Sequence, residues 1–140
     1  KAGERFAVRN SGAVSVIEGC DSNGCEYMTR GTVVILGEVG DNFGAGMTGG
    51  MAFIYDIKNN FEKKINSESV VWQKPETEYW INYLKNLVNE HFINTNSILS
   101  KKIIEDFNKE VLNFVQVCPK EMLDKLENPI SVRPTIKKVI

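Results

Sequence analysis

The stretch GTVVILGEVGDNFGAGMTGGMAFIY, residues 31–55, contains two apolar runs, and each run begins with a glycine. The runs start at Gly31 and Gly50, an interval of 50 − 31 = 19 residues, and the same interval of 31 − 12 = 19 leads back to Gly12. Apolar and β-branched residues at this density favour strands, and glycine supplies the bends between them. A fixed period of this length is typical of coils of chain that stack on one another.

Side chains of similar kind recur at equivalent positions around these three glycines. The recurring sets are Val14, Val33 and Ala52; Val16, Ile35 and Ile54; Asn10, Thr29 and Thr48; and Asn23 with Asn42. In a parallel β-solenoid the apolar sets would stack in the lumen, and the paired asparagines would form an amide ladder at a turn. We therefore predict a solenoid over residues 1–58, with further coils before residue 1 and with positive φ at the repeating glycine bend.

The second half of the chain has a different composition. All 11 glycines lie between Gly3 and Gly50, whereas all four prolines lie beyond residue 74. The predicted strands are apolar on both faces, so they require cover on both faces. Apolar residues at helical spacing predict a helix that Thr77 caps. These residues are Trp80, Leu84, Leu87, Val88 and Phe92.

A second helix is expected after Ser97, which also belongs to the residue types that cap helices. Its apolar stripe consists of Leu99, Ile103, Phe107, Val111 and Phe114. Pro119 should end this helix near Cys118, because the residue before a proline disfavours helical geometry. We predict a linker over residues 59–76. Over residues 77–140 we predict a helical hairpin that packs on the solenoid, a short third helix at 120–126 and an extended tail from residue 129.

Composition excludes several classes of function. The chain has 140 residues, enough for one domain of ordinary size. Its net charge of −1, from 17 basic and 18 acidic side chains, gives no general attraction to nucleic acid or to an anionic membrane, so we predict neither as a partner. The longest apolar runs are far shorter than the ~18 residues of a membrane span. Three cysteines are too few for a disulfide framework and favour a reducing, cytoplasmic compartment.

Residues 44–49, with the sequence GAGMTG, match the G-x-G-x-x-G pattern of dinucleotide-binding loops. That mechanism requires a helix that begins inside the pattern, because the N-terminus of the helix binds the pyrophosphate. Residues 50–55 instead continue as a predicted strand, in register with residues 31–36. We therefore interpret the glycines as a structural turn and predict no cofactor-binding residue there.

No other group of residues predicts a site. His91 is the only histidine, and we interpret it as a partly buried structural residue beside the turn at residues 94–97. Cys20, Cys25 and Cys118 lack the spacing of a metal site, and no cluster of cations would activate Cys118. Charged residues of the first half could line a polar cleft or form a solvated rim; they are Glu18, Glu26, Glu38, Asp41, Asp56, Arg5, Arg9 and Arg30. We predict no catalytic residue and no metal ligand.

Three stretches carry a resemblance to a known family: residues 3–13, GERFAVRNSGA; residues 24–29, GCEYMT; and residues 42–50, NFGAGMTGG. With His91 and residues 114–119, FVQVCP, they make nearly the whole chain similar to the C-terminal domain of the glutamate synthase large chain. The resemblance implies a right-handed parallel β-helix rich in glycine, followed by a helical segment. That fold agrees with the 19-residue period.

The resemblance also implies a function. The parent enzymes take the amide nitrogen of glutamine and convert 2-oxoglutarate reductively to glutamate, with flavin mononucleotide and an iron–sulfur cluster held by other domains. This chain would then be a non-catalytic brace without a cofactor of its own, in the cytoplasm or a plastid stroma. Its partners would be the other domains of the parent chain, and copies could associate through an open solenoid end. Two alternatives remain: an autonomous ligand-binding solenoid, and a solenoid subunit of another redox complex similar to formylmethanofuran dehydrogenase.

Overall fold

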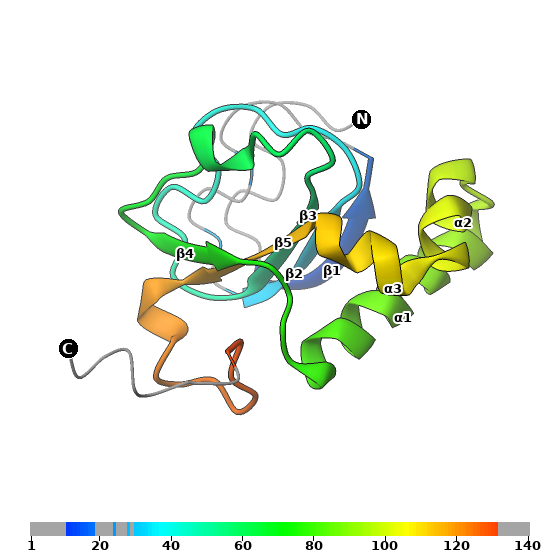
Figure 1. Ribbon diagram of the computed structural model, residues 1–140. Coiled ribbons are helices and arrows are strands. Elements are labelled where there is room, and N and C mark those ends of the chain that lie inside the picture. Colours follow the sequence, from blue (N-terminus) through cyan, green and yellow to red (C-terminus); the bar gives the residue numbers. More distant parts are fainter. Residues whose placement is uncertain (1–10, 19–23, 25–27, 29, 132–140) are drawn as a thin grey trace.

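The computed structural model describes residues 11–18, 24, 28 and 30–131 (Figure 1). Its centre is a five-stranded sheet with the strand order β1-β2-β3-β5-β4. The strands are β1 (Ser11–Ile17), β2 (Arg30–Ile35), β3 (Met51–Tyr55), β4 (Val70–Gln73) and β5 (Phe114–Pro119). Strands β1, β2 and β3 run parallel, whereas β5 is antiparallel to β3 and to β4. The sheet is therefore mixed.

The predicted parallel β-helix is wrong, because the described residues form an open mixed sheet instead of stacked coils. A solenoid would place the next parallel coil beside β3. In this chain the antiparallel strand β5 occupies that edge, with Val115 opposite Ile54 and Val117 opposite Ala52. β-branched residues at alternate positions suit a strand that lies between two others. Residues 1–10, where the predicted open end of the solenoid would lie, are outside the described residues.

The pairing register of β2 with β3 equals the predicted 19-residue interval. Val33 lies opposite Ala52 and Ile35 opposite Ile54, as predicted. The register slips by one residue in β1 after Ser11, so that Ser15, instead of Val14, lies opposite Val33. A slip of one residue turns a side chain to the other face of the sheet. The predicted places of Val14 and Val16 in the columns are therefore wrong, and the Val14 side chain is 55% exposed.

One face of the sheet is covered by loops and carries its own buried apolar cluster. We call it the loop-covered face. Its central aromatic pair is Phe43 and Phe61, whose ring centroids lie 5.5 Å apart in an edge-to-face arrangement. The buried members of the cluster are Met28, Val33, Ile35, Val39, Phe43, Met47, Ala52, Ile54, Phe61, Val70 and Val117.

The opposite face, which we call the helix-covered face, packs against α1 (Glu78–Thr95) and α2 (Ile98–Glu105) (Figure 1). Both predicted N-caps are confirmed: the Trp80 N–H donates to Thr77 Oγ1 at 3.5 Å, and the Ser100 N–H donates to Ser97 Oγ at 3.3 Å. The buried members of this cluster are Val34, Leu36, Met51, Phe53, Tyr55, Leu84, Val88, Ile103, Phe107, Val111, Phe114, Cys118 and Ile130.

The second helix is shorter than predicted. It ends at Glu105, after which α3 (Phe107–Glu110) and the 3-10 turn η2 (Val111–Asn113) lead into β5. Helical spacing predicted correctly that Phe107, Val111 and Phe114 are buried, but it did not predict their conformation. Pairing with β3 and β4 outweighs local helix propensity here, because tertiary contacts routinely override it.

Three further predictions concern the segments at 59–76, at 120–126 and from residue 129. The segment 59–76, predicted as a linker, contains the 3-10 turn η1 (Phe61–Lys63) and the strand β4. Within 120–126, where a helix was predicted, only the 3-10 turn η3 (Lys120–Met122) is helical. Most of the predicted extended tail, residues 132–140, lies outside the described residues.

Candidate functional site

The glycine-rich turn at residues 44–50 leads directly into β3. Gly44, Gly46 and Gly50 have φ angles of 79°, 65° and 86°, a region that disfavours residues with a Cβ. A Cβ at Gly50 would lie 2.7 Å from Met28 Cε and 2.9 Å from the carbonyl oxygen of Gly31, which has a φ of 97°. Backbone conformation and the close approach of two strand starts both require glycine here. The positive φ predicted for Gly31 is confirmed.

Five backbone N–H groups of this turn donate hydrogen bonds inside the protein. Gly44 donates to the Gly24 carbonyl (2.9 Å), Gly46 to Ser69 Oγ (2.9 Å), Met47 to the Gly44 carbonyl (3.0 Å), and Thr48 and Gly49 to the Met28 carbonyl (2.9 and 3.2 Å). A phosphate cradle needs N–H groups that point at the ligand, usually at the start of a helix. The chain continues instead as β3 over residues 51–55, as predicted.

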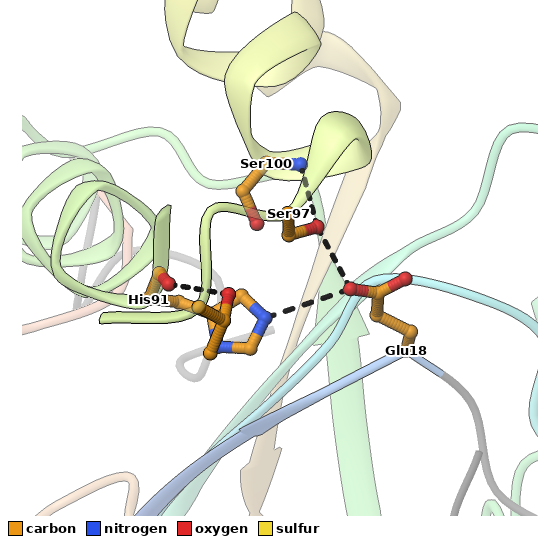
Figure 2. A network of polar contacts seen from close by, with 5 residues as sticks. Glu18, His91, Ser97 and Ser100 are labelled. Carbon is orange, nitrogen blue, oxygen red and sulfur yellow. Dashed lines mark hydrogen bonds and ion pairs between the residues drawn. The ribbon is translucent and has the colours of Figure 1, made fainter. Parts of the chain in front are cut away.

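Glu18, which follows β1, lies between His91 of α1 and Ser97 at the start of α2 (Figure 2). Ser97 Oγ donates a hydrogen bond to Glu18 Oε2 at 2.8 Å. The same oxygen lies 3.6 Å from His91 Nε2, which is buried and has no hydrogen-bond partner. The His91 side chain is 13% exposed, and its backbone carbonyl accepts a hydrogen bond from Thr95 Oγ1 at 2.7 Å.

This cluster contains the residue types of a hydrolase triad but not the geometry. In a triad the imidazole accepts the proton of the serine hydroxyl, and the carboxylate contacts the other side of the imidazole. Here Ser97 donates to the carboxylate, and its oxygen also caps α2. The partly buried position of His91 beside the turn agrees with the prediction. The sequence did not predict Glu18 as its partner, because the two residues are far apart along the chain.

A second polar cluster is buried on the helix-covered face. The Tyr55 hydroxyl donates to Glu110 Oε1 at 2.6 Å, and Asn113 Nδ2 donates to the same oxygen at 3.1 Å. These hydrogen bonds, the one from Tyr55 above all, hold the pKa of Glu110 below its ordinary value. Burial, assisted by the adjacent carboxylate, raises the pKa of Tyr55 above its ordinary value. No pattern in the sequence indicates this pair, whose members lie 55 residues apart.

Two carboxylates of the predicted polar cleft come together at the ends of β2 and β3. Glu38 forms an ion pair with Lys58 at 2.9 Å, and both oxygens of Asp56 accept turn N–H groups, from Asn60 and Phe61. They border a cavity of about 60 Å³. Of the other charged residues of the predicted cleft, Glu18, Arg30 and Asp41 do not line this cavity, and Glu18 lies beside His91. Glu26, Arg5 and Arg9 lie outside the described residues.

Burial raises the pKa of the Cys118 thiol to about 12, which keeps it protonated at neutral pH. Cys20 and Cys25 lie outside the described residues. Within the part of the chain that the structure describes, no three His, Cys, Asp or Glu side chains are grouped so that they could hold a metal ion. Among the same residues, no helix has the length and apolar character needed to cross a membrane.

These features define a small α+β domain whose sequence signature is a glycine-rich turn packed against its own core. The chain belongs to the GXGXG motif family, whose model matches residues 1–120. It is 55% identical over 136 residues to the glutamate synthase (NADPH) large chain of Azospirillum brasilense. It is 44% identical over 138 residues to the glutamate synthase (NADH) of Schizosaccharomyces pombe, and 47% identical over 119 residues to a chloroplastic ferredoxin-dependent glutamate synthase of Arabidopsis thaliana.

These alignments cover 97%, 99% and 85% of this chain, but only 9%, 6% and 7% of the respective relatives. The chain therefore corresponds to less than a tenth of each of these proteins. The resemblance to glutamate synthase large chains that the sequence stretches indicated is confirmed.

Proposed function

We propose that this chain is a non-catalytic structural domain of a glutamate synthase large chain and that it holds the other domains of that chain in fixed relation. The parent would convert glutamine, 2-oxoglutarate and a two-electron reductant into two molecules of glutamate. Flavin mononucleotide and the iron–sulfur cluster would be bound by the other domains. The relatives are named for NADPH, NADH or ferredoxin, so the proposal leaves the electron donor open. The proposed compartment is the cytoplasm or a plastid stroma.

The observation that carries this proposal is that the glycine-rich turn hydrogen-bonds to, and packs against, other residues of this protein. Five of the turn's N–H groups donate to the protein's own acceptors, and a Cβ at Gly44 would lie 3.3 Å from the Val70 side chain. A turn that bound a ligand would present these groups and this space to solvent. Such a turn instead supports a domain whose glycines serve close packing, which is what a rigid spacer needs.

The experiment uses the intact large chain that contains this sequence, and it measures glutamine hydrolysis and glutamate formation separately. His91→Gln and Lys58→Gln replace ionisable side chains that belong to neither buried apolar cluster, so we expect both rates to stay within about twofold of the parent. Gly50→Ala strains the fold, so we expect less glutamate to be formed for each glutamine hydrolysed.

Two results would count against the proposed function. A polar variant that keeps its melting temperature but loses about tenfold or more in kcat would show that this domain takes part in the chemistry. A Gly50→Ala enzyme that is measurably less stable but still couples the two reactions fully would show that the domain does not brace the others.

A further inference from the structure

Residues 128–131, which we call the strap, lie beside the start of α1 at the C-terminal end of the described residues (Figure 1). Two side chains hold its backbone. Trp80 Nε1, in the first turn of α1, donates to the Asn128 carbonyl at 2.8 Å. Gln73 Nε2, at the end of β4, donates to the Ile130 carbonyl at 2.6 Å. The strap is therefore fastened to a helix and to a strand that lie 48 and 57 residues earlier in the chain.

Ile130 is the apolar anchor of the strap. Its side chain is 5% exposed and belongs to the buried cluster of the helix-covered face. The neighbouring residues are more open: Asn128 is half-buried, Pro129 is exposed, and the Ser131 hydroxyl donates to Glu76 Oε1 at 3.1 Å in an exposed hydrogen bond. One buried side chain thus holds the strap, together with hydrogen bonds that are at most partly buried.

These contacts are typical of a segment that opens locally. The strap belongs to no helix or strand, and side chains, instead of a neighbouring strand, bind its carbonyl groups. Segments with few buried apolar contacts and exposed hydrogen bonds open at a lower free energy than the strands and helices of a core. The GXGXG family model, which matches residues 1–120, also ends before the strap begins.

We propose that the strap opens and closes as a unit on a domain that stays folded, and that Ile130 is the residue that keeps it closed. In the open state Ile130 leaves the helix-covered face, and the indole N–H of Trp80 bonds to water. Opening exposes an apolar site between β4 and the start of α1, whose occupant is the chain's own strap. This inference concerns the conformation of the chain and does not depend on the proposed parent enzyme.

The test compares Ile130→Asp with Ile130→Ala in the full 140-residue chain. In a core that cannot open, a buried carboxylate is far more damaging than a cavity. If the strap opens, the aspartate side chain moves into water, and the loss cannot exceed the free energy that keeps the strap closed. We therefore expect both variants to lower Tm by about 3 to 8 °C and to agree within about 2 °C.

Ile103 is the matched control, because it is an isoleucine buried in the same cluster but lies within α2. It cannot reach water unless the packing of this helix is lost. Ile103→Asp should therefore lower Tm by at least about 10 °C more than Ile103→Ala does.

The emission of Trp80 shows whether the strap itself has opened. In a chain that carries Trp72→Phe, Ile130→Asp should red-shift this emission well below Tm, while the far-ultraviolet circular dichroism keeps the signal of the folded chain. The proposal is overturned if Ile130→Asp lowers Tm much more than Ile130→Ala, as at Ile103, or if neither variant lowers it. An unchanged Trp80 emission in Ile130→Asp also overturns it.

Discussion

The two faces of the sheet differ in how far apart along the chain their contacting residues lie. Apart from Val117, the buried cluster of the loop-covered face lies between Met28 and Val70, a span of 70 − 28 = 42 residues. The buried cluster of the helix-covered face extends from Val34 to Ile130, a span of 130 − 34 = 96 residues. Closing longer loops costs more chain entropy. The helix-covered face therefore depends more on the assembly of the whole chain.

This difference explains which parts of the structure can be predicted from a short stretch of sequence. The register of β2 against β3 and the glycine turn between them lie inside one short segment, and local pattern is enough to specify them. The helix-covered face instead combines residues of β2 and β3 with residues of α1, α2 and β5, which lie much later in the chain. Substitutions on the two faces should therefore loosen different parts of the protein.

The largest expected effect is the removal of a buried phenylalanine from either face. Phe53 is fully buried on the helix-covered face, where its ring lies 6.2 Å from Trp80 and 6.4 Å from Tyr83. Phe53→Ala should lower the free energy of unfolding by about 3 to 5 kcal/mol, because it leaves a cavity. Phe43→Ala on the loop-covered face should cost a similar amount. Urea unfolding measures both losses.

The two tryptophans report where each loss occurs, because Trp80 packs with the helix-covered cluster and Trp72 with the loop-covered cluster. In chains that keep a single tryptophan, Phe53→Ala should red-shift the emission of Trp80 and Phe43→Ala that of Trp72. Equal shifts of both tryptophans in both variants would mean that the two faces do not loosen separately.

Sequence reasoning predicted much of the local structure and missed the long-range pairing. The 19-residue interval located β2 and β3, and the capping residues Thr77 and Ser97 located the starts of α1 and α2. The apolar spacing predicts that the second helix continues to about Cys118, because residues 114–118 also fit a helix until β3 and β4 provide partners. Periodicity specifies which side chains are buried, but the partner strands decide the conformation.

The next largest effect distinguishes two glycines of the same turn. A Cβ at Gly50 would meet the carbonyl oxygen of Gly31 at 2.9 Å, whereas a Cβ at Gly44 would meet only side chains, the nearest being Val70 at 3.3 Å. Both have positive φ, so each alanine costs about 1 to 2 kcal/mol in backbone strain. We expect Gly50→Ala to lose about 3 kcal/mol in total and Gly44→Ala about half as much, because side chains move more readily than backbone.

Urea unfolding of the two variants at pH 7 tests this order. If Gly44→Ala proved the more damaging change, the close approach of the starts of β2 and β3 would not be what requires glycine in this turn. If both variants unfolded like the wild type, the positive φ angles themselves would be in doubt.

The polar clusters show the limit of sequence reasoning most clearly. His91 could be recognised as a structural residue because it is the only histidine and lies in a predicted helix. Its partner Glu18 follows another element, and the pair Tyr55 and Glu110 meets only when α3 lies over β3. Side chains of these types are common on surfaces, so their pairing could not be predicted without the fold.

The smallest effect concerns the buried carboxylate of Glu110. Glu110→Gln should lower the free energy of unfolding by about 1 to 2 kcal/mol at pH 7, because the charged acceptor makes the stronger hydrogen bond with Tyr55. The Tyr55 hydrogen bond holds the pKa of Glu110 in the folded chain below its ordinary value. Its contribution is therefore present above that ordinary value and is lost as the pH falls through the folded value.

The difference in stability between wild type and Glu110→Gln should accordingly shrink when urea unfolding is repeated between pH 5 and pH 3. Tyr55→Phe is the matched control: it removes the hydrogen bond that is the main cause of the low pKa, so this variant should lose less stability on acidification than the wild type. A gap between wild type and Glu110→Gln that stays constant down to pH 3 would mean that Tyr55 does not hold the carboxylate in its charged form. The helix-covered face would then owe its cohesion to apolar packing, as the loop-covered face does.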